Sequence, residues 1–87
     1  MVIWMKRKDA ERVIKDEQLV SFSFFEDRTD ASDEMVIKII QGKWIVYATD
    51  ERASKITGGE CIYENEEEAL DGFIRRLRAL NRTRQLF

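Results

Sequence analysis

Hydrophobic residues follow a helical period near both ends of the chain and a period of two between them. In residues 6–18, Ala10, Val13 and Ile14 are spaced by three and four, which places them on one side of a helix. A longer stripe of the same period lies toward the C-terminus and consists of Ala69, Leu70, Phe73, Ile74, Leu77 and Leu80. The pattern therefore predicts a short N-terminal helix and a longer amphipathic C-terminal helix.

Polar residues favour the C-terminal helix at both of its ends. Asn65 is a good N-cap, and Glu68 follows at the spacing of a capping box. Glutamates fill residues 66–68, in the expected first turn. Arginines lie toward the other end, at Arg75, Arg76, Arg78 and Arg82. This order of charges complements the helix dipole.

Four segments between the helices have the composition of strands. Residues 20–24 alternate hydrophobic side chains with serine, which is typical of a half-buried strand. Residues 35–40, 43–49 and 60–64 are rich in β-branched and aromatic side chains and predict three more. Residues 26–34 are polar and acidic, so we expect a solvated loop there.

Gln41 and Gly42 predict a tight hairpin turn, because Gly42 can adopt the positive φ that such a turn requires. In the resulting register Met35, Ile37, Ile39, Trp44, Val46 and Ala48 share one apolar face, which we assign to the core. The opposite face consists of Val36, Lys38, Ile40, Lys43, Ile45 and Tyr47. This mixture of aromatic, aliphatic and basic residues is common at interfaces. Scattered apolar residues on an ordinary surface explain it equally well.

Together these elements predict an α+β domain: an N-terminal helix, a four-stranded antiparallel sheet and a C-terminal amphipathic helix, with the helices packed on one face. The 87 residues have room for a single domain, 1–87. A hydrophobic fraction of 44% with 37% charged residues indicates a folded, soluble protein. The one cysteine, Cys61, rules out an internal disulfide and favours a reducing compartment. We expect a cytoplasmic protein without a membrane span.

Residues suited to catalysis or metal binding are scarce. The chain has no histidine, the commonest general base and metal ligand. We expect Cys61 to be structural, and the acids of residues 26–34 lack the ligand spacing of a calcium loop. Asp50 and Glu51 could form a carboxylate pair, but nothing else in the sequence converges on them. We therefore predict no catalytic residues, no metal, no cofactor and no enzyme activity.

The C-terminal tail, residues 75–87, holds five arginines and no acid, which taken alone indicates nucleic-acid binding. The preceding residues 60–71 carry six acids, and no aromatic platform interleaves with the arginines. The net charge of −2 is also too small to indicate a polyanionic partner. We expect no nucleic-acid partner.

The stretches "GKWIVYATDERAS" and "GGECIYENEEEALDGFIRRLR" resemble a family of small bacterial immunity proteins that accompany polymorphic toxins. The resemblance covers residues 42–78 and rests on Trp44, Tyr47, Glu51, Arg52, Ala53, Glu68, Ala69, Leu70, Phe73 and Leu77. It implies a protein-binding domain that docks on a cognate toxin and blocks or distorts the toxin's active site.

We expect the toxin to bind the mixed sheet face and the charged turn that follows it. The predicted partner-binding residues are Val36, Lys38, Ile45, Tyr47, Asp50, Glu51 and Arg52. A structural turn at residues 50–52, with Arg52 paired to a nearby acid, is the plain alternative for that segment. The alternative function is a homodimeric structural protein that buries the same face together with Val2, Ile3 and Trp4.

Overall fold

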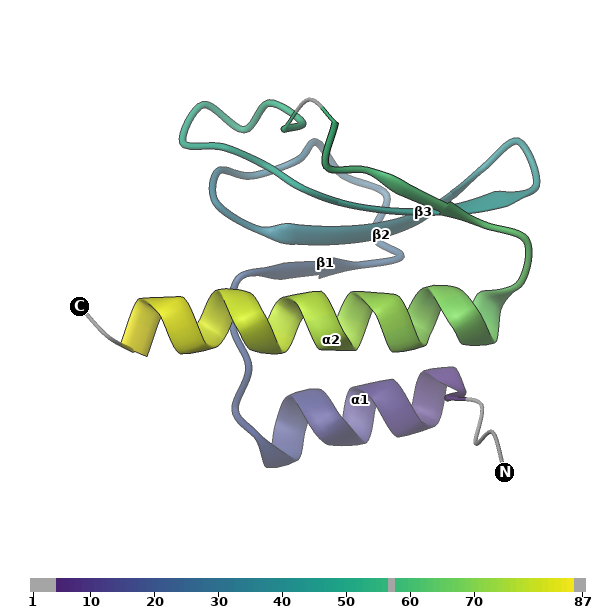
Figure 1. Ribbon diagram of the computed structural model, residues 1–87, viewed down its shortest axis with the longest axis horizontal. Coiled ribbons are helices and arrows are strands. Elements are labelled where there is room, and N and C mark those ends of the chain that lie inside the picture. Colours follow the sequence, from purple (N-terminus) through teal and green to yellow (C-terminus); the bar gives the residue numbers. More distant parts are fainter. Residues whose placement is uncertain (1–4, 57, 86–87) are drawn as a thin grey trace.

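The computed structural model describes residues 5–56 and 58–85, which form two helices and a four-stranded sheet (Figure 1). The elements are α1 (Arg7–Asp16), β1 (Phe22–Phe24), β2 (Met35–Ile40), β3 (Lys43–Ala48), β4 (Cys61–Tyr63) and α2 (Glu66–Gln85). Both helices lie on one side of the sheet, with α2 against the strands and α1 beside α2. The prediction of an α+β domain is confirmed. Residues 2–4, assigned above to a dimer contact, lie outside the described part of the chain.

The sheet is mixed rather than antiparallel. Its strand order is β1-β2-β3-β4, and β1 runs parallel to β2. The prediction of an antiparallel sheet is therefore wrong at this pair, although β2–β3 and β3–β4 are antiparallel. Parallel neighbours need a connection that carries the chain back to the end of the sheet where the first strand began. Residues 25–34 make this return over the face opposite the helices, called here the outer face (Figure 1).

The hairpin of β2 and β3 has the register that its turn predicts. Gln41 and Gly42 have φ values of 51° and 78°, as a primed two-residue turn requires. The observed pairs are Ile40–Lys43, Ile39–Trp44, Lys38–Ile45, Ile37–Val46, Val36–Tyr47 and Met35–Ala48. Since side chains alternate between the faces of a strand, this register fixes which residues face α2.

The core lies between the inner face of the hairpin and α2. Its buried members are Ala10, Leu19, Met35, Ile37, Val46, Ala69, Leu70, Phe73, Ile74 and Leu77. Val13, Ile14 and Leu80 are partly buried and pack against this cluster. Both helical stripes predicted from the sequence therefore point inward, as their spacing indicates.

Polar side chains fix the ends of the elements. The backbone N–H of Glu68 donates to Asn65 Oδ1 at 2.9 Å, so the predicted cap of α2 is present. Asn81 of α2 holds the segment before β1: its Oδ1 accepts from Val20 N–H at 2.9 Å, and its Nδ2 donates to the Val20 carbonyl at 3.1 Å. These two hydrogen bonds use the backbone N–H and C=O of Val20. The strand therefore begins at Phe22 and not at the predicted Val20.

Gly72 of α2 lies directly under the ring of Tyr63 in β4. A β-carbon at this position would stand 2.2 Å from the Tyr63 hydroxyl oxygen and 2.8 Å from Cζ. Glycine normally weakens a helix interior, because it loses more backbone entropy than alanine on folding. Here the missing side chain lets the tyrosine close the space between β4 and α2.

We expect Gly72→Ala to lower the free energy of unfolding by about 1–3 kcal/mol, through overpacking against Tyr63. Denaturant unfolding would measure the change. In a Tyr63→Leu background the same substitution should instead stabilise the protein by about 0.5–1 kcal/mol, the ordinary helix preference for alanine. Equal effects in both backgrounds would show that the close approach does not matter.

Candidate interaction surface

The connection between β1 and β2 covers one half of the outer face. Val36 has 0% of its surface exposed and Tyr47 has 3%, although both side chains point away from the helices. These two residues, predicted to contact a partner, are covered by the protein's own chain. A sheet face is open to water only where nothing crosses it, and residues 25–34 cross this half.

Asp30 fastens that connection to the sheet. Its Oδ2 accepts a hydrogen bond from the Tyr47 hydroxyl at 2.5 Å, and its Oδ1 lies 2.9 Å from the Lys38 ammonium nitrogen. Burial alone would raise the pKa of Asp30, but the hydrogen bonds from Tyr47 and Lys38 hold it below its usual value. Burial and the adjacent carboxylate raise the pKa of Tyr47. Lys38 and Tyr47, predicted as partner-binding residues, therefore hold the loop.

A second polar cluster folds the connection on itself. Arg28 donates to both carboxylate oxygens of Glu34, at 2.8 and 3.1 Å, and Ala31 N–H donates to the same carboxylate at 2.9 Å. Glu34 is buried. The expectation of a solvated acidic loop is thus wrong for Asp30 and Glu34, because a phenol and cations lie against these carboxylates in place of water.

The other half of the outer face, toward the β2–β3 turn, stays open. Ile45 of β3 is half-buried and pairs across the sheet with Ile62 of β4, which is 62% exposed. Ile40 at the end of β2 is also exposed. Lys38 lies beside Ile45 on the other side, so its aliphatic stem extends the apolar row. We call the set Ile40, Ile45 and Ile62 the isoleucine patch.

The charged turn after β3 is built by Asp50. Asp50 Oδ1 accepts hydrogen bonds from the backbone N–H groups of Arg52 and Ser54, at 2.8 and 3.0 Å. Glu51 and Arg52 are exposed, and within residues 5–56 and 58–85 neither side chain forms an ion pair or hydrogen bond. Asp50 is therefore a structural residue of the turn. Glu51 and Arg52 present a carboxylate and a guanidinium group to solvent. Among the described residues, Arg52 is not paired to a nearby acid.

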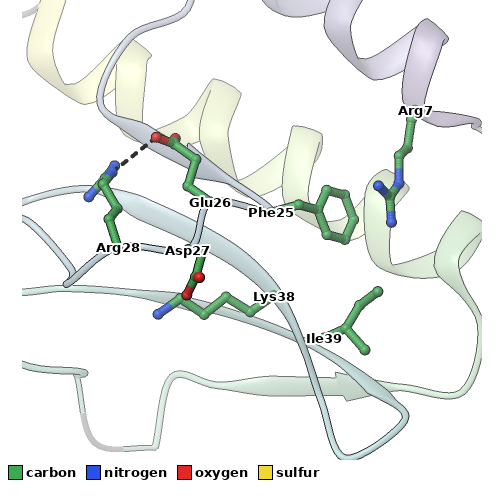
Figure 2. A pocket seen from close by; sticks show the side chains of 7 residues that line it. All are labelled: Arg7, Phe25, Glu26, Asp27, Arg28, Lys38 and Ile39. Atoms are coloured by element: carbon green, nitrogen blue, oxygen red, sulfur yellow. Dashed lines mark hydrogen bonds and ion pairs between the residues drawn. The ribbon is translucent and has the colours of Figure 1, made fainter.

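A hollow of about 390 Å³ lies where the chain leaves β1 and separates from β2 (Figure 2). Its walls are Arg7, Phe25, Glu26, Asp27, Arg28, Lys38 and Ile39. Arg7 stacks on the Phe25 ring at 3.8 Å and also binds Glu66. Arg28 binds Glu26 and Glu34, and Lys38 binds Asp30, so most of the charged side chains that line the hollow have partners within the protein.

Three arginines of α2 bind groups of the protein itself. Arg75 pairs with Asp71, Arg78 binds Glu17 of the segment after α1, and Arg76 donates to the Val46 carbonyl at 3.2 Å. Arg76 also lies 3.5 Å from the sulfur of Cys61, whose side chain is exposed at the edge of the sheet. These contacts give the cluster of arginines a structural role.

Within residues 5–56 and 58–85, no group of three or more histidine, cysteine, aspartate or glutamate side chains is placed to hold a metal ion. Within the same residues, neither helix combines the length and apolar character needed to span a membrane.

The structure defines a small α+β domain with a half-open sheet face and a short strand at one edge. Its sequence matches the family model of Immunity protein 59 over residues 4–86, nearly the whole chain. The chain therefore belongs to the Immunity protein 59 family, and the resemblance to immunity proteins at residues 42–78 is confirmed. No curated protein and no solved structure matches it.

Tyr47→Phe should lower the free energy of unfolding by about 1–3 kcal/mol, since it removes a hydrogen bond from a partly buried carboxylate. Chemical denaturation would measure the loss. In an Asp30→Ala background the same substitution should cost much less, because the partner is already gone. An equal cost in both backgrounds would contradict the assigned contact.

Acid should weaken the fold partly through Asp30. Because the pKa of Asp30 is lower in the folded state, its contribution is present above the unfolded pKa, about 4, and is lost as the pH falls through the folded value. Denaturant unfolding below about pH 4 should therefore show a shallower decline for Asp30→Asn than for the natural chain. Identical acid slopes would contradict this assignment.

Proposed function

We propose that this protein is a non-enzymatic immunity protein that binds a cognate toxin and neutralises it in the cytoplasm of the bacterium that produces both. Membership of the Immunity protein 59 family supports the toxin partner. The isoleucine patch supports binding by contact: Ile45 and Ile62 pair across β3 and β4, Ile62 and Ile40 are exposed, and Lys38 and Lys43 lie beside them. Buried interface cores are typically of this kind, with a polar rim.

The proposed contact surface has two parts, the isoleucine patch and the charged turn after β3, and residues 25–34 cover the sheet between them. Ile45 and Lys38 lie at one end, and Glu51 and Arg52 at the other. Val36, Tyr47 and Asp50 shape this surface from within, because two are buried and the third folds the turn. An apolar centre with charges at its periphery suits a partner that must be held tightly and chosen specifically.

Homodimerisation through the same patch is the second candidate, and the exposure of Ile40 and Ile62 supports it too. The two candidates predict different sedimentation behaviour. A homodimer would form in the purified chain, and its sedimentation coefficient would rise with concentration. A toxin-binding monomer would show a constant sedimentation coefficient and would change only when the toxin is added.

Ile45→Asp and Ile62→Asp should each weaken binding to the toxin by about thirtyfold or more, the effect expected of an interface centre. The partner to test is the product of the gene adjacent to this one. Co-purification and growth of cells that express both proteins would measure binding and protection.

Val20→Asp is the matched control, because Val20 is 55% exposed and lies on the segment before β1, away from the patch. It should leave protection unchanged. Loss of protection by Val20→Asp as well would point to general destabilisation. Full protection by both patch variants would exclude the patch, and an adjacent gene product that is neither bound nor neutralised would count against the function.

A further inference from the structure

Strand β4 is the edge of the sheet beside the isoleucine patch, and it offers free backbone groups. Thr49 N–H donates to the Glu34 carbonyl, so Tyr47, Ile45 and Lys43 turn their backbone groups toward β2 by the alternation of the ladder. Trp44 and Val46 therefore face β4, where they pair with Tyr63 and Cys61. The N–H and C=O of Ile62, between them, point outward from the sheet.

The side chains of the edge place an apolar residue between two acids. Ile62 lies on the outer face next to Ile45, and the same alternation puts Glu60 and Glu64 on that face, two positions to either side. An extended chain bound along this edge would meet Ile62 at its centre and a carboxylate at each end. The edge thus has both the backbone groups and the side-chain pattern that strand addition uses.

The two acids are available to a partner. Glu60 lies 3.0 Å from Lys55, and Glu64 contacts Lys43, but all four side chains are exposed. Ion pairs in such positions contribute little, and a carboxylate can accept hydrogen bonds from a second cation. Lys43 belongs to β3, so the Glu64 carboxylate lies nearer the free edge than the lysine that it contacts.

The same acids disfavour pairing between two copies of β4. In a symmetric antiparallel pair centred on Ile62, Glu60 of one copy would stand opposite Glu64 of the other, twice. Like charges directly opposed across strands are destabilising. Edge strands are commonly protected from self-association in this way.

We propose that β4 binds an extended segment of the partner protein as a fifth strand, and that this segment carries a central apolar residue flanked by lysine or arginine. This inference rests on the proposed function, since it assigns how the partner is held. Backbone hydrogen bonds at Ile62 supply the attachment, the apolar residue covers Ile62 and Ile45, and the cations meet Glu60 and Glu64.

The double variant Glu60→Lys/Glu64→Lys supplies a probe of this chemistry, because it presents the same edge with reversed charge. We expect the natural chain and the double variant each to remain monomeric alone. Mixed at about millimolar concentration, they should associate roughly tenfold or more tightly than either does with itself. Sedimentation equilibrium with a reducing agent, which keeps exposed Cys61 from forming disulfides, would measure this.

Two further measurements separate strand pairing from simple charge attraction. Adding Ile62→Pro to the double variant removes the outward N–H, which β3 does not use, and should abolish the association. Ile62→Val keeps the N–H and should preserve it. If the proline variant fails to fold, slower amide exchange of Ile62 in the mixture than in either protein alone gives the same answer.

No association in the mixture, or association that survives Ile62→Pro, would overturn the strand-addition inference. Neither result would contradict the proposed function, which depends on binding and neutralisation of the adjacent gene product. A complex with that product in which the Ile62 amide exchanges as fast as in the free chain would leave toxin binding intact and also overturn the inference.

Discussion

The link between Asp30 and the sheet determines how the outer face is divided. A connection between parallel strands must cross a face of the sheet, and the bonds from Tyr47 and Lys38 to Asp30 hold it over one half. The crossing turns Val36 and Tyr47 into interior residues. It also leaves the end near the β2–β3 turn open, and the isoleucine patch is exposed there.

The helices and the hairpin could be predicted because they depend on local sequence. The apolar stripe of α2, the Asn65 cap and the Gln41–Gly42 turn each act over a few residues, and the turn fixed the whole β2–β3 register. The direction of β1 depends instead on a connection with no turn signal and on partners far along the chain, such as Asp30 with Tyr47. Contacts between residues so far apart in the sequence leave no local pattern from which they could be predicted.

The candidate surface was predicted in part for the same reason. The sequence indicated the correct face for Ile45 and Lys38 but could not show that the loop buries Val36 and Tyr47. It also missed Ile62, whose place beside Ile45 follows only from the β3–β4 register. The alternation of Glu60, Ile62 and Glu64 is present in the sequence. It indicates a binding edge only because β4 lies at the edge of the sheet.

Helix α2 follows all four strands along the chain, and this order has a consequence for folding. This helix supplies half of the buried core cluster, from Ala69 to Leu77, so the strands made earlier cannot bury their inner face until it is synthesised. The β2–β3 hairpin can form early, because its ends are joined by a tight turn. The hairpin therefore keeps its inner face exposed to water until α2 has been made and packs against it.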